Sequence, residues 1–423
     1  MAFADHFAVI DDDLADLSAL YEDLHEHPEL SFQEVRTAEV LAKRLEALGY
    51  AVTTGVGRTG VVAILENGDG PNVLLRADID ALPVTEETGL PYASTARAVD
   101  HEGAEVGVAH ACGHDMHATW MIGAAHWLVE HRDLWSGRVM IVMQPAEEHG
   151  AGAQTMVDDG LFERFGTPDV CLGQHLAPAP AGWVLLRGGV AMAASDAVKI
   201  TLHGRGGHGS SPQMTVDPAI MAASTIMKLQ TIVSRETAPG DEAVVTVGTV
   251  RVGTKENVIA DKAELRVNVR SFTNYVRERV LASIERIAHG EAHSCGAERD
   301  PEIEHLYHFP ALSNSEAEAA IVFARFQQHF GLENSMEAPK ASGSEDFGCF
   351  AEAAGCPSVF WFTGGHDKAA WFEAFNNGRI EQEVPYNHSP KFAPSQHPTI
   401  RTGIEALLVA AEHWIGKSEQ ATS

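Results

Sequence analysis

The sequence predicts an α/β protein with two domains. The larger domain has a mixed, largely parallel sheet flanked by helices, and a smaller α+β domain is inserted in it. Two observations support this fold class. Helical and strand patterns alternate up to about Arg187, and strands of alternating polarity follow. Alternating strands and helices are typical of a parallel sheet covered by helices, whereas alternating polarity is typical of a sheet with one exposed face.

The elements of the larger domain follow from local patterns. Helical spacing extends over residues 11–48, and the apolar runs VVAILE and NVLLRADID predict buried strands bounded by Gly and Pro. A second cycle predicts a helix after His117, a strand in RVMIVMQP, a helix beginning near Gly152 and a strand in DVCLGQHL. Ligands of such a sheet bind at the carboxyl ends of its strands.

The inserted domain is predicted from three alternating strands, DAVKITLHG, AVVTVGTVRV and AELRVNVRSF, with helical stretches at 217–235 and 275–292. We expect the insertion to comprise residues 188–301 and the larger domain residues 1–187 and 302–423. The last part of the chain returns to the first pattern, with a helix near Ala317, the loop GSEDFG, the strand SVFWFT and a terminal helix from about Ile400.

Composition excludes several kinds of partner. With 59 acidic and 30 basic residues, the net charge of −29 repels phosphate backbones and anionic lipid, so we expect neither nucleic acid nor membrane as a partner. The start lacks a basic and apolar leader, and no stretch approaches the ~18 apolar residues of a membrane span. Five scattered cysteines predict reduced thiols and, together with these features, a cytoplasmic protein.

The densest chemical signal is the segment HACGHDMH at residues 110–117, with five potential ligands or ligand-orienting side chains in eight positions. Thiolate and imidazole together suit borderline metals such as Zn, Co or Ni. Asp115 could orient the ring of a metal-binding histidine through a hydrogen bond, without binding the metal itself. A polar loop with hydrogen-bonded histidines is the alternative, and it accounts poorly for this density.

Further candidate ligands follow the ends of predicted strands, where an α/β fold brings side chains together. Each one alone is typical of a solvated or structural residue, but together they predict a metal centre with an adjacent proton carrier. These candidates are Asp78, Asp80, Glu147, Glu148 and His175, with His388 far along the chain.

Nine ordered motifs, covering almost the whole chain, resemble the aminoacylase and carboxypeptidase family of binuclear metallopeptidases. The closest resemblance is to its amidohydrolase branch, which holds hippurate hydrolase and auxin-conjugate hydrolase type enzymes. The motifs are HEHPELSFQE, LRADIDALP, HACGHDMHAT, QPAEEHGAGA, GQHL, GRGGHGSSP, ENVIAD, GSEDF and NHSPKF.

The resemblance implies that the larger domain is catalytic and holds two divalent metal ions per subunit, either Zn, Mn, Co or Ni. Glu147 is then the general base, and Asp80 orients a metal ligand. Asp78 stands where other branches use a metal-binding histidine, a role that Cys112 supplies in part. The implied metal ligands are Cys112, His114, Glu148, His175 and His388.

The resemblance also implies that the inserted domain is a lid and a dimer contact. His208 would present its ring to the scissile carbonyl, commonly across the dimer, although a turn residue in a Gly-rich hairpin is the alternative. Asn257 would reach the substrate carboxylate or carbonyl, but Ala260 replaces the usual proline of its motif. Arg270 is the candidate for binding the carboxylate.

The function implied is hydrolysis of N-acyl amino acids, or related small conjugates, to a carboxylic acid and an amino acid. A dipeptidase or carboxypeptidase acting on short peptides is the alternative within the same chemistry, and an inactive binding protein is a more distant one. We expect a homodimer, with a tetramer as the open alternative.

Overall fold

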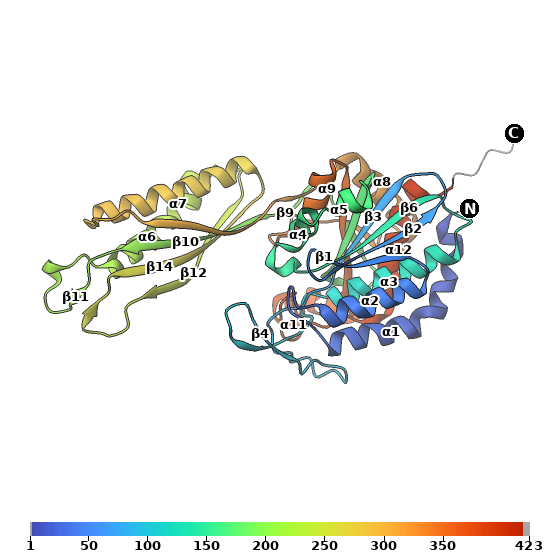
Figure 1. Ribbon diagram of the computed structural model, residues 1–423, viewed down its shortest axis with the longest axis horizontal. Coiled ribbons are helices and arrows are strands. Elements are labelled where there is room, and N and C mark those ends of the chain that lie inside the picture. Colours follow the sequence, from blue (N-terminus) through green and yellow to red (C-terminus); the bar gives the residue numbers. More distant parts are fainter. Residues whose placement is uncertain (1, 418–423) are drawn as a thin grey trace. The chain divides into compact units, whose positions relative to one another are not determined.

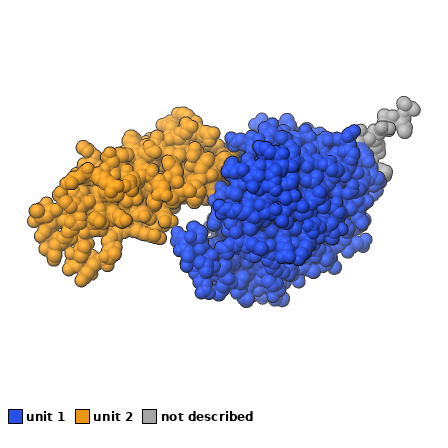
Figure 2. Space-filling model, viewed as in Figure 1, with its two compact units in different colours: residues 1–191, 313–339, 346–423 blue, residues 192–312, 340–345 orange. Residues whose placement is uncertain are grey.

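The computed structural model describes residues 2–417 and consists of two compact units, coloured separately in Figure 2. Unit 1 contains the chain up to Ala191, Ser313–Pro339 and the chain from Asp346 onward, whereas unit 2 contains Met192–Leu312 and Lys340–Glu345. The sequence placed the boundaries after residues 187 and 301. The second boundary differs because the strand β15 (Glu302–Phe309) belongs to the sheet of unit 2.

Unit 1 is built on an eight-stranded sheet (Figure 1). The neighbours β6, β3, β7 and β18 form a parallel block at its centre. Outside this block, β1 and β2 pair antiparallel with their neighbours, and β8 pairs antiparallel with β18 but parallel with β17. This sheet confirms the predicted fold class. In sheet order, the strands are β1 (Ala51–Val56), β2 (Gly60–Asn67), β6 (Gly137–Gln144), β3 (Asn72–Asp78), β7 (Val170–Pro180), β18 (Ser358–His366), β8 (Val184–Leu186) and β17 (Ser335–Glu337).

The helices of unit 1 pack around this sheet and around one another. The helices α3 and α12 approach each other closely, since a Cβ atom on Gly403 of α12 would lie 2.2 Å from the ring of Trp120 on α3, and α1 contacts both helices. The longer helices are α1 (Ile10–Glu26), α2 (Val35–Ala47), α3 (His114–Glu130), α8 (Glu316–Phe330) and α12 (Gln396–Ile415), and the shorter ones are α4 (Gly152–Asp158), α5 (Leu161–Phe165), α9 (Gly348–Ala354), α10 (Lys368–Asn376) and α11 (Ile380–Glu383).

The helical stretch expected at residues 11–48 is two helices separated by residues 27–34. Pro28 in this gap disfavours helical backbone at the residue before it, and His27 accordingly leaves the helical conformation, with φ −125° and ψ 54°, where α1 ends. The gap matters for function, because Ser31 and Glu34 within it contact the candidate site described below.

Unit 2 has a four-stranded antiparallel sheet with the order β12 (Ala243–Val252), β14 (Lys262–Ser271), β10 (Ala194–His203) and β15. Alternate residues of β14 are buried under the helices α6 (Pro218–Thr231) and α7 (Asn274–Ser294). A two-stranded ribbon, β11 (Gly207–His208) with β13 (Val258–Ile259), extends from this unit.

Short elements complete the chain: the 3-10 turns Phe3–Val9, Glu147–His149 and Pro212–Met214, the π-helical turn Ile232–Glu236, and the strands β4 (Arg97–Val99), β5 (Glu105–Gly107), β9 (Gly189–Met192) and β16 (Leu312–Asn314). Within residues 2–417, none of the helices combines the length and the apolar character that crossing a bilayer requires.

Candidate metal centre

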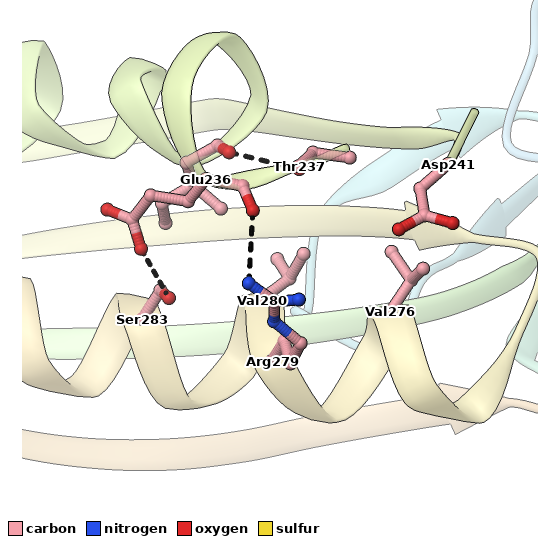
Figure 3. Close-up of a pocket in the computed structure, with 8 residues that line it drawn as sticks. Glu236, Thr237, Asp241, Val276, Arg279, Val280 and Ser283 are labelled. Carbon is pink, nitrogen blue, oxygen red and sulfur yellow. Dashed lines mark hydrogen bonds between the residues drawn. The ribbon is translucent and has the colours of Figure 1, made fainter. Parts of the chain in front are cut away.

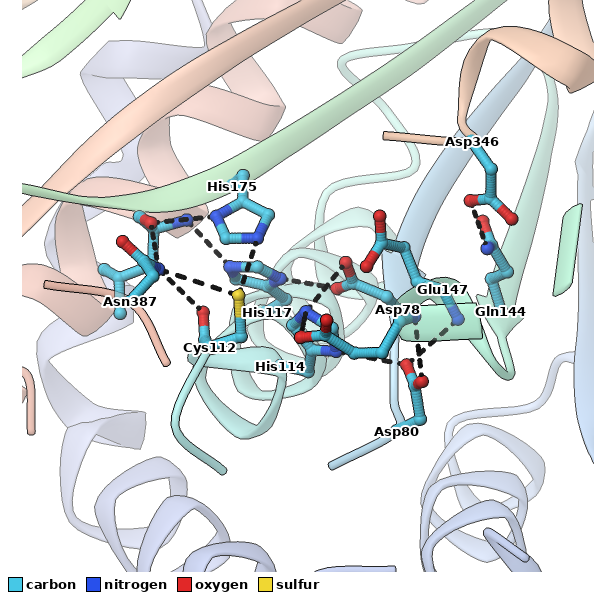
Figure 4. Close-up of polar contacts among 12 residues, drawn as sticks. Asp78, Asp80, Cys112, His114, His117, Gln144, Glu147, His175, Asp346 and Asn387 are labelled. Atoms are coloured by element: carbon cyan, nitrogen blue, oxygen red, sulfur yellow. Dashed lines mark hydrogen bonds and ion pairs between the residues drawn. The ribbon is translucent and has the colours of Figure 1, made fainter. Parts of the chain in front are cut away.

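The candidate metal centre lies at the carboxyl ends of the parallel strands of unit 1 (Figure 4). Strand β3 ends at Asp78, β6 ends three residues before Glu147, and β7 carries His175. These strands are neighbours in parallel register, so their ends meet at one edge of the sheet. The helix α3 begins there with His114, directly after Gly113 in the left-handed region at φ 88°.

Asp80 is the centre of a hydrogen-bond network. Its Oδ1 lies 3.2 Å from Nδ1 of His114 and accepts the N–H of Glu147 at 3.2 Å, while Oδ2 accepts from the N–H of Glu148 at 3.1 Å and the hydroxyl of Ser31 at 2.7 Å. Burial alone would raise the pKa of Asp80, but the hydrogen bond and charge of His114 hold it below its usual value. An ionised Asp80 therefore holds a proton on Nδ1 of His114, so that Nε2 is the ring nitrogen that a metal ion would bind.

A strained turn directs Glu147 and Glu148 into the site. Ala146, buried just before them, has φ 48° and ψ 41°, a conformation that costs about 1 kcal/mol or more for a residue with a side chain. The turn is held by the Ala146 N–H, which donates to Glu34 at 2.8 Å, and by the N–H of Gly152, which donates to the Ala146 carbonyl at 3.1 Å.

The structure brings the five implied metal ligands together. His175 Nε2 lies 3.5 Å from the Cys112 sulfur, and His114 Nε2 lies 3.9 Å from Oε1 of Glu148. The same carboxylate oxygen lies 3.4 Å from Nε2 of His388. Two ligand atoms that are each about 2.0–2.3 Å from one ion lie about 3–4 Å apart, so these spacings suit shared coordination.

Two observations indicate that a cation fits between these atoms. His114 Nε2 and Glu148 Oε1 are both buried, and neither forms a hydrogen bond with any residue in the described part of the chain. Negative charge also outweighs positive charge there: surrounding carboxylates, led by Asp78, overcome the effect of burial and raise the pKa of His114 to about 10. Burial and the charges of Glu148 and Glu147 raise the pKa of Cys112 well above its ordinary value.

His117 lies among the potential ligands, together with Asp78, His114 and His175. Both of its ring nitrogens already have protein partners, because Nδ1 bonds Asp78 and Nε2 accepts the N–H of Leu176 at 2.8 Å. We therefore interpret His117 as a residue that positions the β7 backbone and not as a ligand.

Asp78 is likewise occupied by protein groups. It accepts from His117 and from Nη1 of the buried Arg76 at 3.0 Å. Arg76 also donates through Nε to Gln144 at 2.7 Å, which ties β3 to β6. Burial opposes ionisation, but Arg76 and the neighbouring histidines hold the pKa of Asp78 well below its usual value.

The loop before α12 supplies His388, whose backbone has φ 71° and whose N–H donates to the Ala111 carbonyl at 2.7 Å. Its neighbour Asn387 donates to the carbonyls of Leu176, at 3.2 Å, and Cys112, at 3.3 Å. Asn387 was not singled out from the sequence. Its place beside His388 in the motif NHSPKF was the one available signal.

Asp115 faces away from the metal ligands. Its Oδ2 lies 2.7 Å from Nδ1 of the buried His25, whose Nε2 lies 3.1 Å from Glu86. Burial lowers the pKa of His25, but these two carboxylates outweigh it and raise the pKa to about 10. The suggestion that Asp115 orients a ligand ring is therefore wrong: it anchors the first turn of α3 to α1.

The other three residues singled out from the sequence belong to unit 2. His208 is exposed on β11, with Nδ1 2.8 Å from the Ser210 hydroxyl. Asn257 lies beside it, because its carbonyl accepts the N–H of Gly209 at 2.9 Å. Arg270 on β14 is half-buried and donates through Nε to Asn268, at 3.0 Å, and through Nη1 to Ser344, at 2.6 Å.

Fold and site together define a metal-binding enzyme of the α/β class. The family model described as peptidase family M20/M25/M40 matches residues 74–382. The chain belongs to this family of hydrolases, in agreement with the resemblance carried by the nine motifs.

Three relatives illustrate the similarity. N-acetylcysteine deacetylase of Bacillus subtilis is 35% identical over 396 residues, which are 93% of each chain. Hippurate hydrolase of Campylobacter jejuni is 37% identical over 342 residues, 80% of this chain and 85% of the relative. The crystal structure of a dinuclear metal-binding peptidase of the M20 family from Bacillus subtilis has a TM-score of 0.73 at 30% identity, covering 95% of this chain and 98% of that one.

Proposed function

We propose that this protein hydrolyses the amide bond of N-acyl amino acids, or related small acyl conjugates, to a carboxylic acid and a free amino acid. The observation that carries the proposal is the pair of buried, unbonded atoms His114 Nε2 and Glu148 Oε1, 3.9 Å apart beside Glu147. Relatives named hippurate hydrolase and N-acetylcysteine deacetylase support the substrate class.

Two divalent ions would be held by the five residues Cys112, His114, Glu148, His175 and His388. When bound, such ions lower the pKa of water and polarise a carbonyl oxygen. A Cys, His and carboxylate set accepts Zn, Mn, Co or Ni, so the native ion follows from availability as well as from the ligands.

The protein's own groups would then act as follows. Asp80 keeps the ring of His114 and the backbones of both glutamates in place through three hydrogen bonds, and a fourth, from the Ser31 hydroxyl, holds Asp80 itself. Glu147 takes the proton from the attacking water and passes it to the nitrogen of the departing amine. This proton transfer needs a carboxylate that does not bind metal. Glu147 would therefore carry the proton, whereas Glu148 would bind metal.

Unit 2 is proposed as the lid and dimerisation domain. His208 would donate to the developing oxyanion, and Asn257, which shares its ribbon, would bind the substrate's carboxylate or carbonyl. Arg270 would bind the carboxylate through Nη2, since Nε and Nη1 already donate to Asn268 and Ser344.

A homodimer formed through unit 2 is supported by the edge strand β12 and by apolar side chains on α6. Ile220 is 64% exposed and Met227 is 71% exposed, and they lie on one face of that helix. Light scattering on wild type and on a Met227→Glu variant tests this. Loss of the dimer in the variant is expected, and a monomeric wild type would contradict it, while a tetramer would add a second interface.

We also propose a cytoplasmic location, where reducing conditions suit five free cysteines.

The substrate proposal is tested by measuring amine release from N-acetyl and N-benzoyl amino acids and from free dipeptides. Cleavage of the acylated amino acids is expected. Cleavage of the dipeptides alone would instead identify a dipeptidase or carboxypeptidase, and no cleavage with any of the four metals would favour a binding protein.

A further inference from the structure

Two cysteines of unit 1 lie in contact, apart from the metal centre. Cys171, the second residue of β7, is buried, and its sulfur lies 3.7 Å from that of Cys356, which immediately precedes Pro357 and the strand β18. The two residues are 185 positions apart in the chain, so only the parallel pairing of β7 with β18 brings them together.

The two cysteines lie in different kinds of backbone, one in the sheet and one in a connection between elements. Cys171 belongs to the parallel block of the sheet, and its N–H donates to the Pro357 carbonyl at 3.0 Å. Cys356 lies in the short connection between α9 and β18, after Gly355 in the left-handed region at φ 65°. A disulfide needs the sulfurs at about 2.0 Å, a movement that rotation of the Cys356 side chain and a small shift of this connection can provide.

The two thiols differ in accessibility and in acidity. Cys356 is partly exposed, whereas Cys171 is buried. The contact with Cys171 lowers the pKa of the Cys356 thiol, while the same contact, together with burial, raises the pKa of Cys171. An accessible thiol with a lowered pKa beside a second thiol is the arrangement that peroxides oxidise selectively.

We propose that Cys171 and Cys356 form an oxidisable pair, which a peroxide converts reversibly into an intramolecular disulfide. In the first step, the Cys356 sulfur attacks one peroxide oxygen; an S–O bond forms, the O–O bond breaks, and the departing oxygen takes up the thiol proton and leaves as water (or as an alcohol, from an alkyl peroxide). In the second step, the Cys171 sulfur loses its proton and attacks the Cys356 sulfur; the S–S bond forms, the S–O bond breaks, and the departing hydroxide takes up that proton and leaves as water.

The disulfide would close a loop that contains all of unit 2. Residues 172–355 include both segments of that unit, Met192–Leu312 and Lys340–Glu345. Cross-linking across so long a stretch restricts the unfolded chain, so the oxidised protein should unfold at a higher temperature than the reduced one. The link also joins β7 to the segment that leads into its neighbouring strand β18. It does so at Cys171, four residues before His175 on β7.

The test uses the full-length protein treated with hydrogen peroxide, then denatured in iodoacetamide and digested without reductant. We expect a peptide in which Cys171 is linked to Cys356, its disappearance after dithiothreitol, and a higher thermal midpoint of the oxidised protein. If both cysteines are instead recovered as separate alkylated or over-oxidised peptides, the proposal is wrong.

Matched variants sharpen the result. Cys356→Ser, at a partly exposed position, should abolish the linked peptide and the rise in midpoint, whereas Cys295→Ser, in unit 2, should leave both unchanged. In Cys171→Ala, a sulfenic acid should accumulate at Cys356 and be trapped by dimedone. Trapping at other cysteines but not at Cys356 would contradict its role as the attacking thiol.

Discussion

The ring of His117 accepts the backbone N–H of Leu176, at 2.8 Å, and thereby holds the strand segment that presents the metal-ligand candidate His175. The carbonyl of the same Leu176 lies 2.8 Å from Nδ1 of His175. This contact keeps the His175 proton on Nδ1, so that its Nε2 faces Cys112 as a lone pair. The backbone of one residue, Leu176, therefore connects the positioning histidine His117 to the ligand candidate His175.

The two bonds of His117 can be separated by substitution. His117→Gln places an acceptor near the Nε2 position and can keep the bond to Leu176, whereas His117→Asn keeps only the donor near Nδ1 and leaves a buried N–H unpaired. We expect His117→Asn to lose about 1–3 kcal/mol of unfolding free energy and to release metal more readily to a chelator, with a smaller loss in His117→Gln. Urea unfolding measures the loss of stability, and chelator competition measures the release of metal. Equal losses in His117→Asn and His117→Gln would contradict the proposal that His117 acts through its bond to Leu176.

The adjacent glutamates provide a matched pair. Glu147→Gln should retain metal but lose about 10²–10⁴-fold in turnover, because only the proton transfer is removed. Glu148→Gln should instead lose metal. Elemental analysis beside kcat measurement distinguishes the two, and a normal rate in Glu147→Gln would refute the assignment of the base.

Cys112→Ala should weaken metal retention, since it removes the sulfur that lies 3.5 Å from His175 Nε2. Cys295→Ala in unit 2 serves as the control. Metal content after dialysis measures the effect, and two tightly bound ions in Cys112→Ala would exclude a ligand role.

Glu34 predicts a pH dependence of stability. Burial, and then the charge of Asp80, raise the pKa of Glu34 from 4.5 to about 7. A raised carboxyl pKa means that the folded state binds the proton more tightly, so this stabilisation is complete below pH 4.5 and is lost as the pH rises to about 7. At about 1.4 kcal/mol per pKa unit, the loss is up to about 3 kcal/mol.

Glu34→Gln cannot titrate, and its amide can still accept the N–H groups of Phe32 and Ala146. In metal-stripped protein, the stability of Glu34→Gln relative to wild type should therefore rise across this pH range. Urea unfolding at several pH values checks this. Parallel curves for the two proteins would show that Glu34 is not the titrating group.

We assign no ligand to the pocket of unit 2 that is lined by Glu236, Arg279 and Ser283 (Figure 3). Its polar side chains already bond one another: Glu236 accepts from Ser283 at 2.9 Å, and Arg279 donates to the Glu236 carbonyl at 3.3 Å. We interpret it as packing between the π-helical turn and α7.

Much of the fold was accessible from the sequence, because the strands of the central block are apolar runs ended by Gly or Pro. The strand β15 was missed for a physical reason: EIEHLYHF lies at the edge of its sheet, with most of its residues exposed, and so lacks a strong apolar pattern. The short helix α10 and the parallel strand β17 are also too brief to give a reliable period.

The candidate ligands could be named from motifs, but their supporting contacts could not. Nothing in the sequence indicates that His117 uses both nitrogens on protein groups, or that Asp115 turns towards His25, since both lie within the same eight-residue motif as Cys112 and His114. Such roles depend on side-chain direction at the start of α3, which only the three-dimensional structure fixes.

The most direct test of the account is a metal titration of chelator-stripped protein, with release of free amino acid from an N-acyl amino acid as the readout. We predict no cleavage in the stripped protein, followed by activity that rises with added Zn, Mn, Co or Ni and levels off at two ions per chain. Full activity in the stripped protein, or a plateau at one ion per chain, would contradict a two-metal centre formed by these five ligands.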